Sequence, residues 1–452
     1  MKRYSYIILT ALTILSVSCN RPIRYDLIVE NATIFDVNTG EVIPGKTILV
    51  NGDSIVGIID ANEPVRTKKV VDADGRLVTP GNIDTHVSFE KAIYSTHKNA
   101  DNHPKVLTTF YRSRFSRNYL PYGITTALDM GTEQQWLDQI YQWKQNPKFT
   151  DLLVSLNMEP FYDLDLNEFD SKIQNALNDL FSKNVKYIYV DKCLSPEKSK
   201  LLKQRANQKN ITIFEKIDSS PCSLKESPNI EHIYSPILYV FDKYGDRKAV
   251  DKQIENIYGK ATKLPEEIYT LEVFKFIVEN SPELLDTIIA SIDPKTVSIS
   301  SNLHSLAEYC DLNHFKSEIN SDKIKLSNEL KHRVAYNFNH MLSFVKRMHD
   351  SNISLRIGTN SQNAGKAFVA EQMILADAGI NAADIIKIST INAAKALGID
   401  NQVGSIEVGK KANLVIYDES PLDNPINFAS TRRVVKSGRL FKRYAAKLDI
   451  EE

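Results

Sequence analysis

The apolar positions near the start of the chain fall in short runs that are rich in β-branched residues. Residues 27–29 (LIV) and 48–50 (ILV) are two such runs. Runs of this kind, bounded by turn residues, are typical of β-strands. Residues 38–40 (NTG) supply one turn, and Asn51 followed by Gly52 is a strong hairpin signal. Residues 25–69 are therefore predicted to be all strand.

The end of the chain has the same character. Residues 412–417 (ANLVIY) form one apolar run, and residues 433–436 (RVVK) form another that is closed by Ser437 and Gly438. Short strands at both ends of a chain can pair with each other. We therefore expect residues 19–79 and 402–447 to build one small β-sandwich domain that flanks the intervening segment.

The middle of the chain alternates apolar runs with longer helical patterns. Residues 124–128, 152–156, 187–190 and 211–214 are continuous apolar runs of the kind found in buried parallel strands. After the second run, Ile173, Leu177, Leu180 and Phe181 recur at helical spacing.

This alternation extends over residues 80–401 and predicts an α/β fold with a parallel sheet. The segment exceeds the roughly 250 residues that a (β/α)8 TIM barrel typically needs. An open doubly wound sheet is the alternative, but no glycine-rich phosphate loop follows the first strand. Residues 244–341 are rich in helical patterns, and we expect this helical excursion to cover the mouth of the barrel.

The first residues of the chain resemble an export signal. Lys2 and Arg3 precede a mostly apolar run over residues 6–17, and small residues lead into Cys19. This is typical of a bacterial lipoprotein signal peptide, here residues 1–18, with Cys19 as the lipidated residue. Plain cleavage to a soluble protein is the alternative. No later segment is apolar for long enough to span a bilayer. We therefore predict a cell-envelope protein, held to the membrane by lipid alone and facing the periplasm.

Charge and cysteine content narrow the possible partners. Lysine plus arginine and aspartate plus glutamate both total 56, so the formal net charge is +0. A neutral chain argues against nucleic acid as a partner, because phosphate binding needs a basic face. Cys193, Cys222 and Cys310 form no C-x-x-C pair. A disulfide between two of them is possible but cannot be assigned from sequence. We expect the three cysteines to be buried and to act as small apolar residues.

One motif points to a family. Residues 78–88 (VTPGNIDTHVS) resemble the first barrel strand of the amidohydrolase superfamily, whose pattern is P-G-x-I-D-x-H-x-H. The chain most resembles the branch of imidazolonepropionase-like and Xaa-Pro dipeptidase-like enzymes. Further matching motifs follow in the same order at residues 123–126 (GITT), 230–232 (IEH), 355–360 (LRIGTN), 390–398 (TINAAKALG) and 404–414 (GSIEVGKKANL).

The resemblance implies metal-assisted hydrolysis of carbon–nitrogen bonds. In this family one or two divalent ions activate a water molecule, and a carboxylate accepts its proton. Two histidines at i and i+2 on the first strand point to the same side and bind metal. A carbamylated lysine, two further histidines and a base from the eighth strand complete the site.

Four of the six expected side chains are replaced in this chain. The first histidine of the pair is His86 and the later one is His232. Two histidines are fewer than the three protein ligands of a usual catalytic zinc site, and an amide is no base. The resemblance places Ser88 at the second histidine of the pair, Tyr189 at the lysine, Phe214 at the third histidine and Asn360 at the base.

We therefore expect no metal or other cofactor. The alternative is one weakly held zinc or other divalent ion, with Glu90 or Glu215 joining the two histidines. Strand alternation places Phe214 inward and Glu215 outward, which argues against Glu215. Ser88 beside His86 is a further candidate nucleophile, but no third group in the neighbouring sequence would orient a base.

Two functions remain open. The first is a pseudoenzyme whose pocket, lined by His86, Ser88, Tyr189, Phe214, His232 and Asn360, binds a neutral small molecule, or which pairs with a paralogous envelope protein. The second is a hydrolase of amide, lactam or dipeptide bonds with an altered site that uses His86, His232 and a carboxylate. Asp129, Asp191 and Lys192 are expected at the barrel mouth as solvated charges.

Overall fold

The structure is a computed structural model that describes residues 24–441 apart from residues 62, 64, 68, 95–105, 144–145, 261–262, 313, 316–323 and 362. The predicted signal peptide, Cys19 and residues 442–447 of the predicted β-domain lie outside the described residues. In the described part of the chain, no helix has both the length and the apolar character that crossing a bilayer requires.

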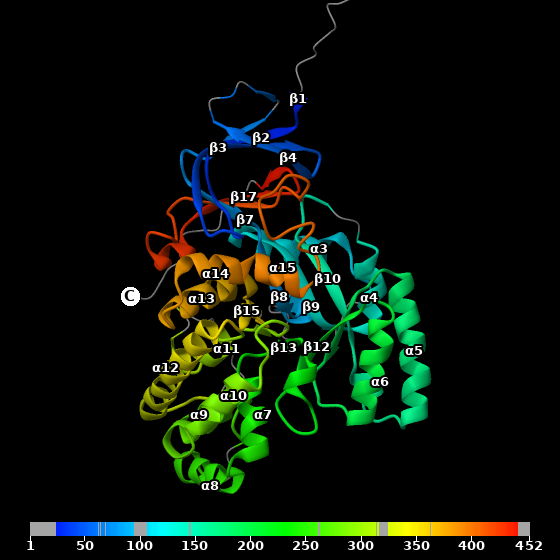
Figure 1. The fold of residues 1–452 in the computed structure, drawn as a ribbon, viewed down its shortest axis with the longest axis vertical. Coiled ribbons are helices and arrows are strands. Elements are labelled where there is room, and N and C mark those ends of the chain that lie inside the picture. The colour runs from blue at the N-terminus through cyan, green and yellow to red at the C-terminus, as the bar shows by residue number, and fades with distance from the viewer. Residues whose placement is uncertain are drawn as a thin grey trace, which may run out of the picture.

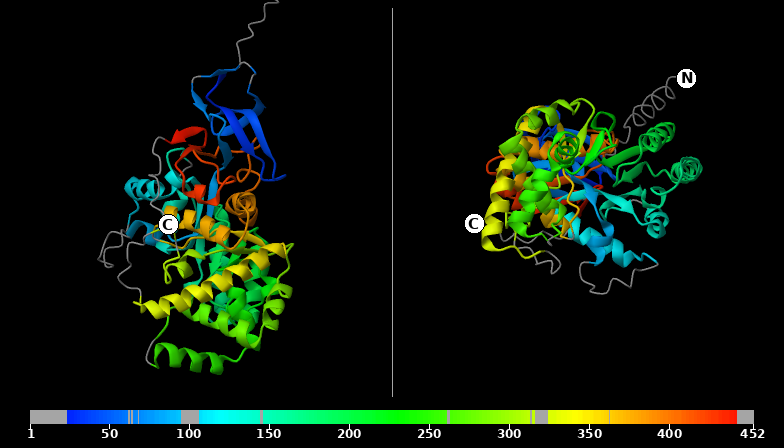
Figure 2. Two further views of the ribbon diagram at one scale, coloured as in Figure 1. Left: turned by 90° about the vertical axis from the view of Figure 1, so that its left-hand side faces the viewer. Right: turned by 90° about the horizontal axis from the view of Figure 1, so that it is seen from below.

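Both ends of the chain contribute to one mixed eight-stranded sheet, as predicted (Figures 1 and 2). The segments meet where β7 pairs parallel with β2 and antiparallel with β16. The alternating buried residues of these strands form their own apolar core, separate from that of the barrel. The strands, in sheet order, are β18 (Arg439–Phe441), β17 (Arg432–Lys436), β16 (Leu414–Tyr417), β7 (Leu77–Pro80), β2 (Leu27–Phe35), β3 (Val42–Asn51) and β4 (Ser54–Asp60), with β6 (Val70–Asp72) also beside β2.

The β-domain continues directly into the barrel through Gly81. This residue lies between β7 and the first barrel strand, and its N–H donates to the carbonyl of Asn413 over 2.8 Å. A Cβ atom at this position would lie 2.3 Å from Oγ1 of Thr125. The glycine of the Pro80–Gly81 step therefore lets the chain pass close to β9 (Ile124–Thr132) of the barrel while it is still hydrogen-bonded to Asn413, next to β16 of the mixed sheet.

The middle of the chain forms the predicted barrel of eight parallel strands. The four strands predicted from apolar runs are all present, whereas the last three strands have only three residues each. The barrel strands, in chain order, are β8 (Asn82–Val87), β9 (Ile124–Thr132), β10 (Asp151–Asn157), β11 (Tyr187–Val190), β12 (Thr212–Lys216), β13 (Asn229–Glu231), β14 (Ser298–Ser300) and β15 (Ser354–Arg356).

Backbone hydrogen bonds close the barrel between its first and last strands. The N–H of Thr85 donates to Ile357, and the carbonyl of His86 accepts from Thr359 and Asn360 over 3.0 and 2.7 Å. Gly358 permits this approach, because a Cβ there would lie 2.2 Å from Oγ of Ser300. The closure leaves the side chain of His86 inside the barrel, next to the last strand.

Helices surround the barrel. The helix predicted from the spacing of Ile173, Leu177, Leu180 and Phe181 is present as α5 (Leu166–Ser182). Ile173, Leu177 and Leu180 are buried against the barrel, whereas Phe181 at the end of the helix is 61% exposed.

The helix-rich stretch at residues 244–341 contains an unpredicted barrel strand. β14 interrupts it, so the stretch is two insertions rather than one excursion. The start of α9 lies at the mouth, where Glu266 binds Lys216 of β12 over 2.8 Å. The first insertion holds α7 (Ser235–Tyr244), α8 (Arg247–Tyr258), α9 (Glu266–Asn280) and α10 (Glu283–Ala290), and the second holds α11 (His304–Ala307) and α12 (Asn328–Asp350).

Two cysteines are joined at the carboxyl ends of the strands. Cys193, after β11, and Cys222, after β12, form a disulfide with a Cα–Cα distance of 5.4 Å. The expectation of small apolar residues was wrong for these two, because the fold brings together loops that are 29 residues apart in sequence. Cys310 is buried and free, as expected.

Two buried carboxyl groups stabilise the first barrel strands. Asp129 accepts from the N–H of Phe89 and the hydroxyl of Thr132, both over 2.8 Å. Burial raises the pKa of Asp129 to about 7, despite these hydrogen bonds. Burial likewise raises the pKa of Asp84 to about 8. Asp129 is therefore part of the core and not the solvated charge that was expected at the mouth.

These carboxyls should make stability fall as the pH rises. The folded state retains a proton on Asp129 up to about pH 7, whereas the unfolded chain releases it near pH 4. Each such proton contributes a slope of about 1.4 kcal/mol per pH unit in this window. Asp129→Asn, which keeps an oxygen for Phe89, should give a shallower fall in unfolding free energy between about pH 4 and 7.

Urea unfolding at several pH values measures this slope. The matched control is Asp293→Asn, because Asp293 is exposed and its hydrogen bonds to Lys295 and Thr296 hold its pKa below 3.8. Equal slopes for the wild type and Asp129→Asn would contradict the assignment of a buried, protonated Asp129.

Candidate functional site

The predicted site residues lie at the carboxyl ends of the barrel strands, where barrel enzymes place their catalytic groups. The structure brings three of them together. The ring of His86 lies 5.2 Å from that of His232 and 5.6 Å from that of Tyr189, measured between centroids. His86 on β8, Tyr189 on β11 and His232 directly after β13 therefore form a compact aromatic group.

The other three predicted residues have separate surroundings. The hydroxyl of Ser88 accepts from the N–H of Lys91 over 3.3 Å and so caps α2 (Phe89–Tyr94). The amide oxygen of Asn360 accepts from the Lys91 ammonium group over 3.0 Å. Phe214 is fully buried deeper in the barrel, so it cannot line an accessible pocket as expected.

A buried ion-pair network that the sequence analysis missed occupies the space between the expected ligand positions. Nδ1 of His86 lies 2.7 Å from Oε2 of Glu231. The second carboxylate oxygen of Glu231 accepts from the guanidinium group of Arg356. Glu231 and Arg356 are both completely buried. The network therefore links strands β8, β13 and β15 across the barrel interior.

Further contacts fix Arg356 in place. Its guanidinium group donates to Oγ of Ser298 and to the carbonyl of Ile230, both over 3.2 Å. Its central carbon lies 5.2 Å from the ring centroid of Phe214, in a cation–π geometry. Phe214, at a predicted metal-ligand position, is thus the platform for an organic cation.

The network controls the charge of Glu231. Burial alone would raise the pKa of this carboxyl, but Arg356 and His86 outweigh it and hold the pKa below its ordinary value. Arginine remains protonated in proteins. The barrel interior therefore contains a permanent carboxylate–guanidinium pair whose carboxylate also fixes one nitrogen of His86.

The acidic side chains near His86 and His232 are not placed to bind a divalent ion together with these histidines. Arg356 and His86 occupy both oxygens of Glu231, and Glu215 points away from the interior to lie 3.3 Å from the ammonium group of Lys203. Glu90 lies in the first turn of α2. Throughout the described residues, no three histidine, cysteine or acidic side chains converge as a metal site would require.

His232 is the chemically distinctive residue at the mouth. Its Nδ1 is buried and has no hydrogen-bond partner within the described part of the chain. Burial, followed by His86 and Lys216, lowers the pKa of His232 well below 6.5. The ring stacks on Tyr234, with centroids 5.1 Å apart. His232 is therefore a neutral imidazole with an unused nitrogen.

Two other expected mouth residues form a small polar group. The hydroxyl of Tyr162 donates to the carboxylate of Asp191, and Lys192 lies over the Tyr162 ring at 5.6 Å. Burial and Asp191 together raise the pKa of Tyr162 far above its ordinary value. These contacts stabilise the loop after β11 and bring no carboxylate to His86.

A local sequence signal for the missed network exists. Arg356 stands between Leu355 and Ile357 in an apolar run, and Glu231 follows Ile230. A charged residue inside a buried strand is rare unless it has a partner. The pairing of these two residues could not be read from sequence, because they are 125 residues apart.

Comparison with known proteins agrees with this geometry. Residues 274–440 match the amidohydrolase family. An adenine deaminase from Gluconobacter oxydans (strain 621H) is 36% identical over 103 residues, which are 23% of this chain and 15% of that protein. The chain thus matches only about a seventh of the length of this curated relative.

The similarity to solved structures covers nearly the whole chain. A Xaa-Pro dipeptidase with bound methionine in the active site has a TM-score of 0.59 at 14% identity, covering 92% of this chain and 100% of that chain. Ochratoxinase from A. niger has a TM-score of 0.59 at 15% identity, with coverages of 92% and 95%. At such low identity these structures share the fold alone. Together, the matched segment and the shared fold confirm the resemblance to the amidohydrolase family that the sequence motifs predict.

Proposed function

We propose that this protein is a non-catalytic member of the amidohydrolase fold that binds a small organic molecule at its barrel mouth. The observation that carries the proposal is the buried network of Arg356, Glu231 and His86. It places a fixed organic cation among the positions where the family resemblance expects metal ligands.

Electrostatics support this proposal. A divalent ion close to Arg356 would have a second cation beside it in a site with low dielectric, and the nearby carboxylate, Glu231, is already paired with that cation. Releasing Glu231 to bind the ion would leave the buried guanidinium group without its partner, which is strongly unfavourable. In addition, the base position holds Asn360, whose oxygen already accepts from Lys91. The site therefore lacks both a favourable position for a divalent ion and a carboxylate base that could accept a proton from a bound water.

The mouth retains groups that suit an uncharged ligand. The rings of Tyr189, His232 and Tyr234 lie around His86 and each other, and the buried Nδ1 of His232 has no hydrogen-bond partner within the described residues, so it is available to a ligand. Aromatic rings with a few convergent polar groups are typical of sites for small organic molecules. A paralogous envelope protein at this position would be detected instead by co-purification.

The protein should not acquire stoichiometric zinc. After incubation with zinc chloride and desalting, we expect elemental analysis to find well under one ion per chain, with no difference between the wild type and His86→Ala/His232→Ala. Equal traces in both would mark surface binding. One zinc per wild-type chain that the double variant loses would contradict the proposal.

The network itself has a matched pair of variants. Arg356→Met leaves Glu231 buried without a cation, and we expect the unfolding free energy to fall by about 3–5 kcal/mol. In Arg356→Met/Glu231→Gln the uncompensated charge is removed, so much of this loss should be recovered. Equal stability of the two variants would show that the ion pair does not stabilise the interior.

A second candidate function rests on His232. A neutral imidazole with a free nitrogen can accept a proton from water, and the similar proteins include an adenine deaminase and a Xaa-Pro dipeptidase. On this alternative, the protein would hydrolyse an amide, lactam or dipeptide without a metal, with His232 as the base.

Turnover assays separate the two functions. In the presence of a chelator, we expect the wild type to hydrolyse dipeptides, N-acyl amino acids and lactams no faster than His232→Ala does. The control is His332→Ala, because His332 is exposed on α12. Turnover that His232→Ala abolishes and His332→Ala preserves would establish the alternative.

We also propose that the protein is exported and anchored through lipid on Cys19. The disulfide between Cys193 and Cys222 supports export, because such bonds persist in oxidising compartments. We expect the full chain in the membrane fraction and Cys19→Ser in the soluble periplasmic fraction. Cytoplasmic localisation of the full chain would contradict this proposal.

A further inference from the structure

One barrel connection lacks the helix that normally covers the wall. Every other link between consecutive barrel strands contains at least one α-helix, whereas residues 217–228 between β12 and β13 contain only the 3-10 turn Leu224–Glu226. The wall is therefore left open between α6 (Pro196–Asn207), which precedes β12, and α15 (Ile391–Ala396) at the end of the barrel.

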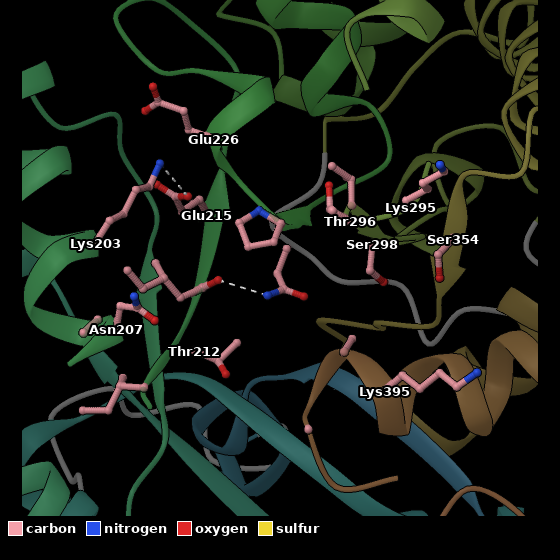
Figure 3. A pocket seen from close by; sticks show the side chains of 18 of the residues that line it. Lys203, Asn207, Thr212, Glu215, Glu226, Lys295, Thr296, Ser298, Ser354 and Lys395 are labelled. Carbon is pink, nitrogen blue, oxygen red and sulfur yellow. Dashed lines mark hydrogen bonds and ion pairs between the residues drawn. The ribbon is translucent and has the colours of Figure 1, made fainter. Parts of the chain in front are cut away.

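A pocket of about 850 Å³ occupies this opening (Figure 3). Thr212, Asn229, Ser298 and Ser354 line it, and each is the first residue of its strand. The pocket therefore lies at the amino ends of the strands, opposite the mouth that holds His86 and His232. Its volume lies within the range of roughly 300–1,000 Å³ that is typical of small-molecule sites.

A buried carboxylate lies on one side of the pocket. Glu215 is 4% exposed, and its Oε2 has no hydrogen-bond partner within the described residues. The same oxygen forms an ion pair with the ammonium group of Lys203, at 3.3 Å. Burial of a carboxylate is unfavourable unless it is well paired. Oε2 of Glu215 thus has a charged neighbour but no hydrogen bond within the described residues, and it can accept one from a ligand in the adjoining cavity.

The opposite side of the pocket has the complementary charge. Figure 3 shows Lys295 and Lys395 on either side of Ser298 and Ser354, across the cavity from Glu215. Both lysines are exposed. The hydroxyl of Ser298 accepts from Arg356 and is still able to donate. Two lysines and two serines thus line the side of the pocket opposite Glu215, and they supply donors for an acidic group.

We propose that this pocket binds a small zwitterion, an aliphatic molecule with an ammonium group at one end and a carboxylate at the other. Glu215 accepts from the ammonium group, and Lys295, Lys395 and the two serines bind the carboxylate. Between the two ends, Ile213, Pro228 and Val297 provide apolar walls for the methylene chain. This site is separate from the barrel mouth and does not depend on the function proposed for it.

Calorimetric titration with γ-aminobutyrate, ε-aminohexanoate and ω-aminooctanoate tests this proposal. We expect one of the three to bind, and hexylamine and hexanoate, which each carry one of the two charges, to bind at least about tenfold more weakly. Failure of all three to bind at millimolar concentration would overturn the proposal, as would equal binding of the singly charged compounds.

Variants locate the site. Glu215→Gln should weaken binding by about tenfold or more through the ammonium end, and Lys295→Gln/Lys395→Gln should do so through the carboxylate end. Both lysines are exposed, so the double variant should fold even if Glu215→Gln does not. His232→Ala should bind as the wild type does. Unchanged binding in the lysine variant, or loss in His232→Ala, would overturn the assignment.

Discussion

The contact between Arg356 and Glu231 governs the interior of this barrel. Both groups are fully buried, and neither is tolerable there without the other. The carboxylate also fixes one nitrogen of His86, and the guanidinium group lies over Phe214. Positions that would hold a metal in the family resemblance are thus joined by a permanent internal salt bridge.

This salt bridge explains why the metal ligands that the family resemblance expects are not needed in this barrel. Substitution at Ser88, Tyr189 and Asn360 removes ligands and the base but does not by itself account for the charge at the centre of the barrel. Arg356 supplies a cation that cannot leave, and Ser298 and the carbonyl of Ile230 satisfy part of its hydrogen-bonding capacity. The barrel therefore keeps an internal ion pair that needs no exchangeable ion.

The sequence predicted the fold further than it predicted the site. Long apolar runs located β9 to β12, because such strands have a pattern that can be read over several residues. β14 has three residues and no pattern of its own, so it was hidden in a helix-rich stretch. The proximity of His86 and His232 followed from the family motif. The partners Glu231 and Arg356 did not, because only barrel closure brings β15 next to β8 and turns the side chain of Glu231 on β13 toward both.

Local rules also failed where tertiary contacts decide. Strand alternation placed Glu215 outward correctly, yet it gave no sign that the adjoining wall lacks a helix. The pairing of Cys193 with Cys222 depends on two loops that follow neighbouring strands, which spacing alone does not reveal. Helical spacing predicted α5, but it did not show that Phe181 would be exposed while Ile173, Leu177 and Leu180 are buried.

The passage from β7 through Gly81 into β8 has a consequence for how the molecule comes apart. One uninterrupted stretch of chain is hydrogen-bonded to β16 on one side of this glycine and to β9 on the other. If this stretch separated from its neighbours, the mixed sheet would lose β7, which lies between β2 and β16, and the barrel would lose β8, which closes it. The two lobes are therefore mechanically coupled. A cut at Gly81 would leave the barrel strands and β16 to β18 on one fragment and the rest of the mixed sheet on the other.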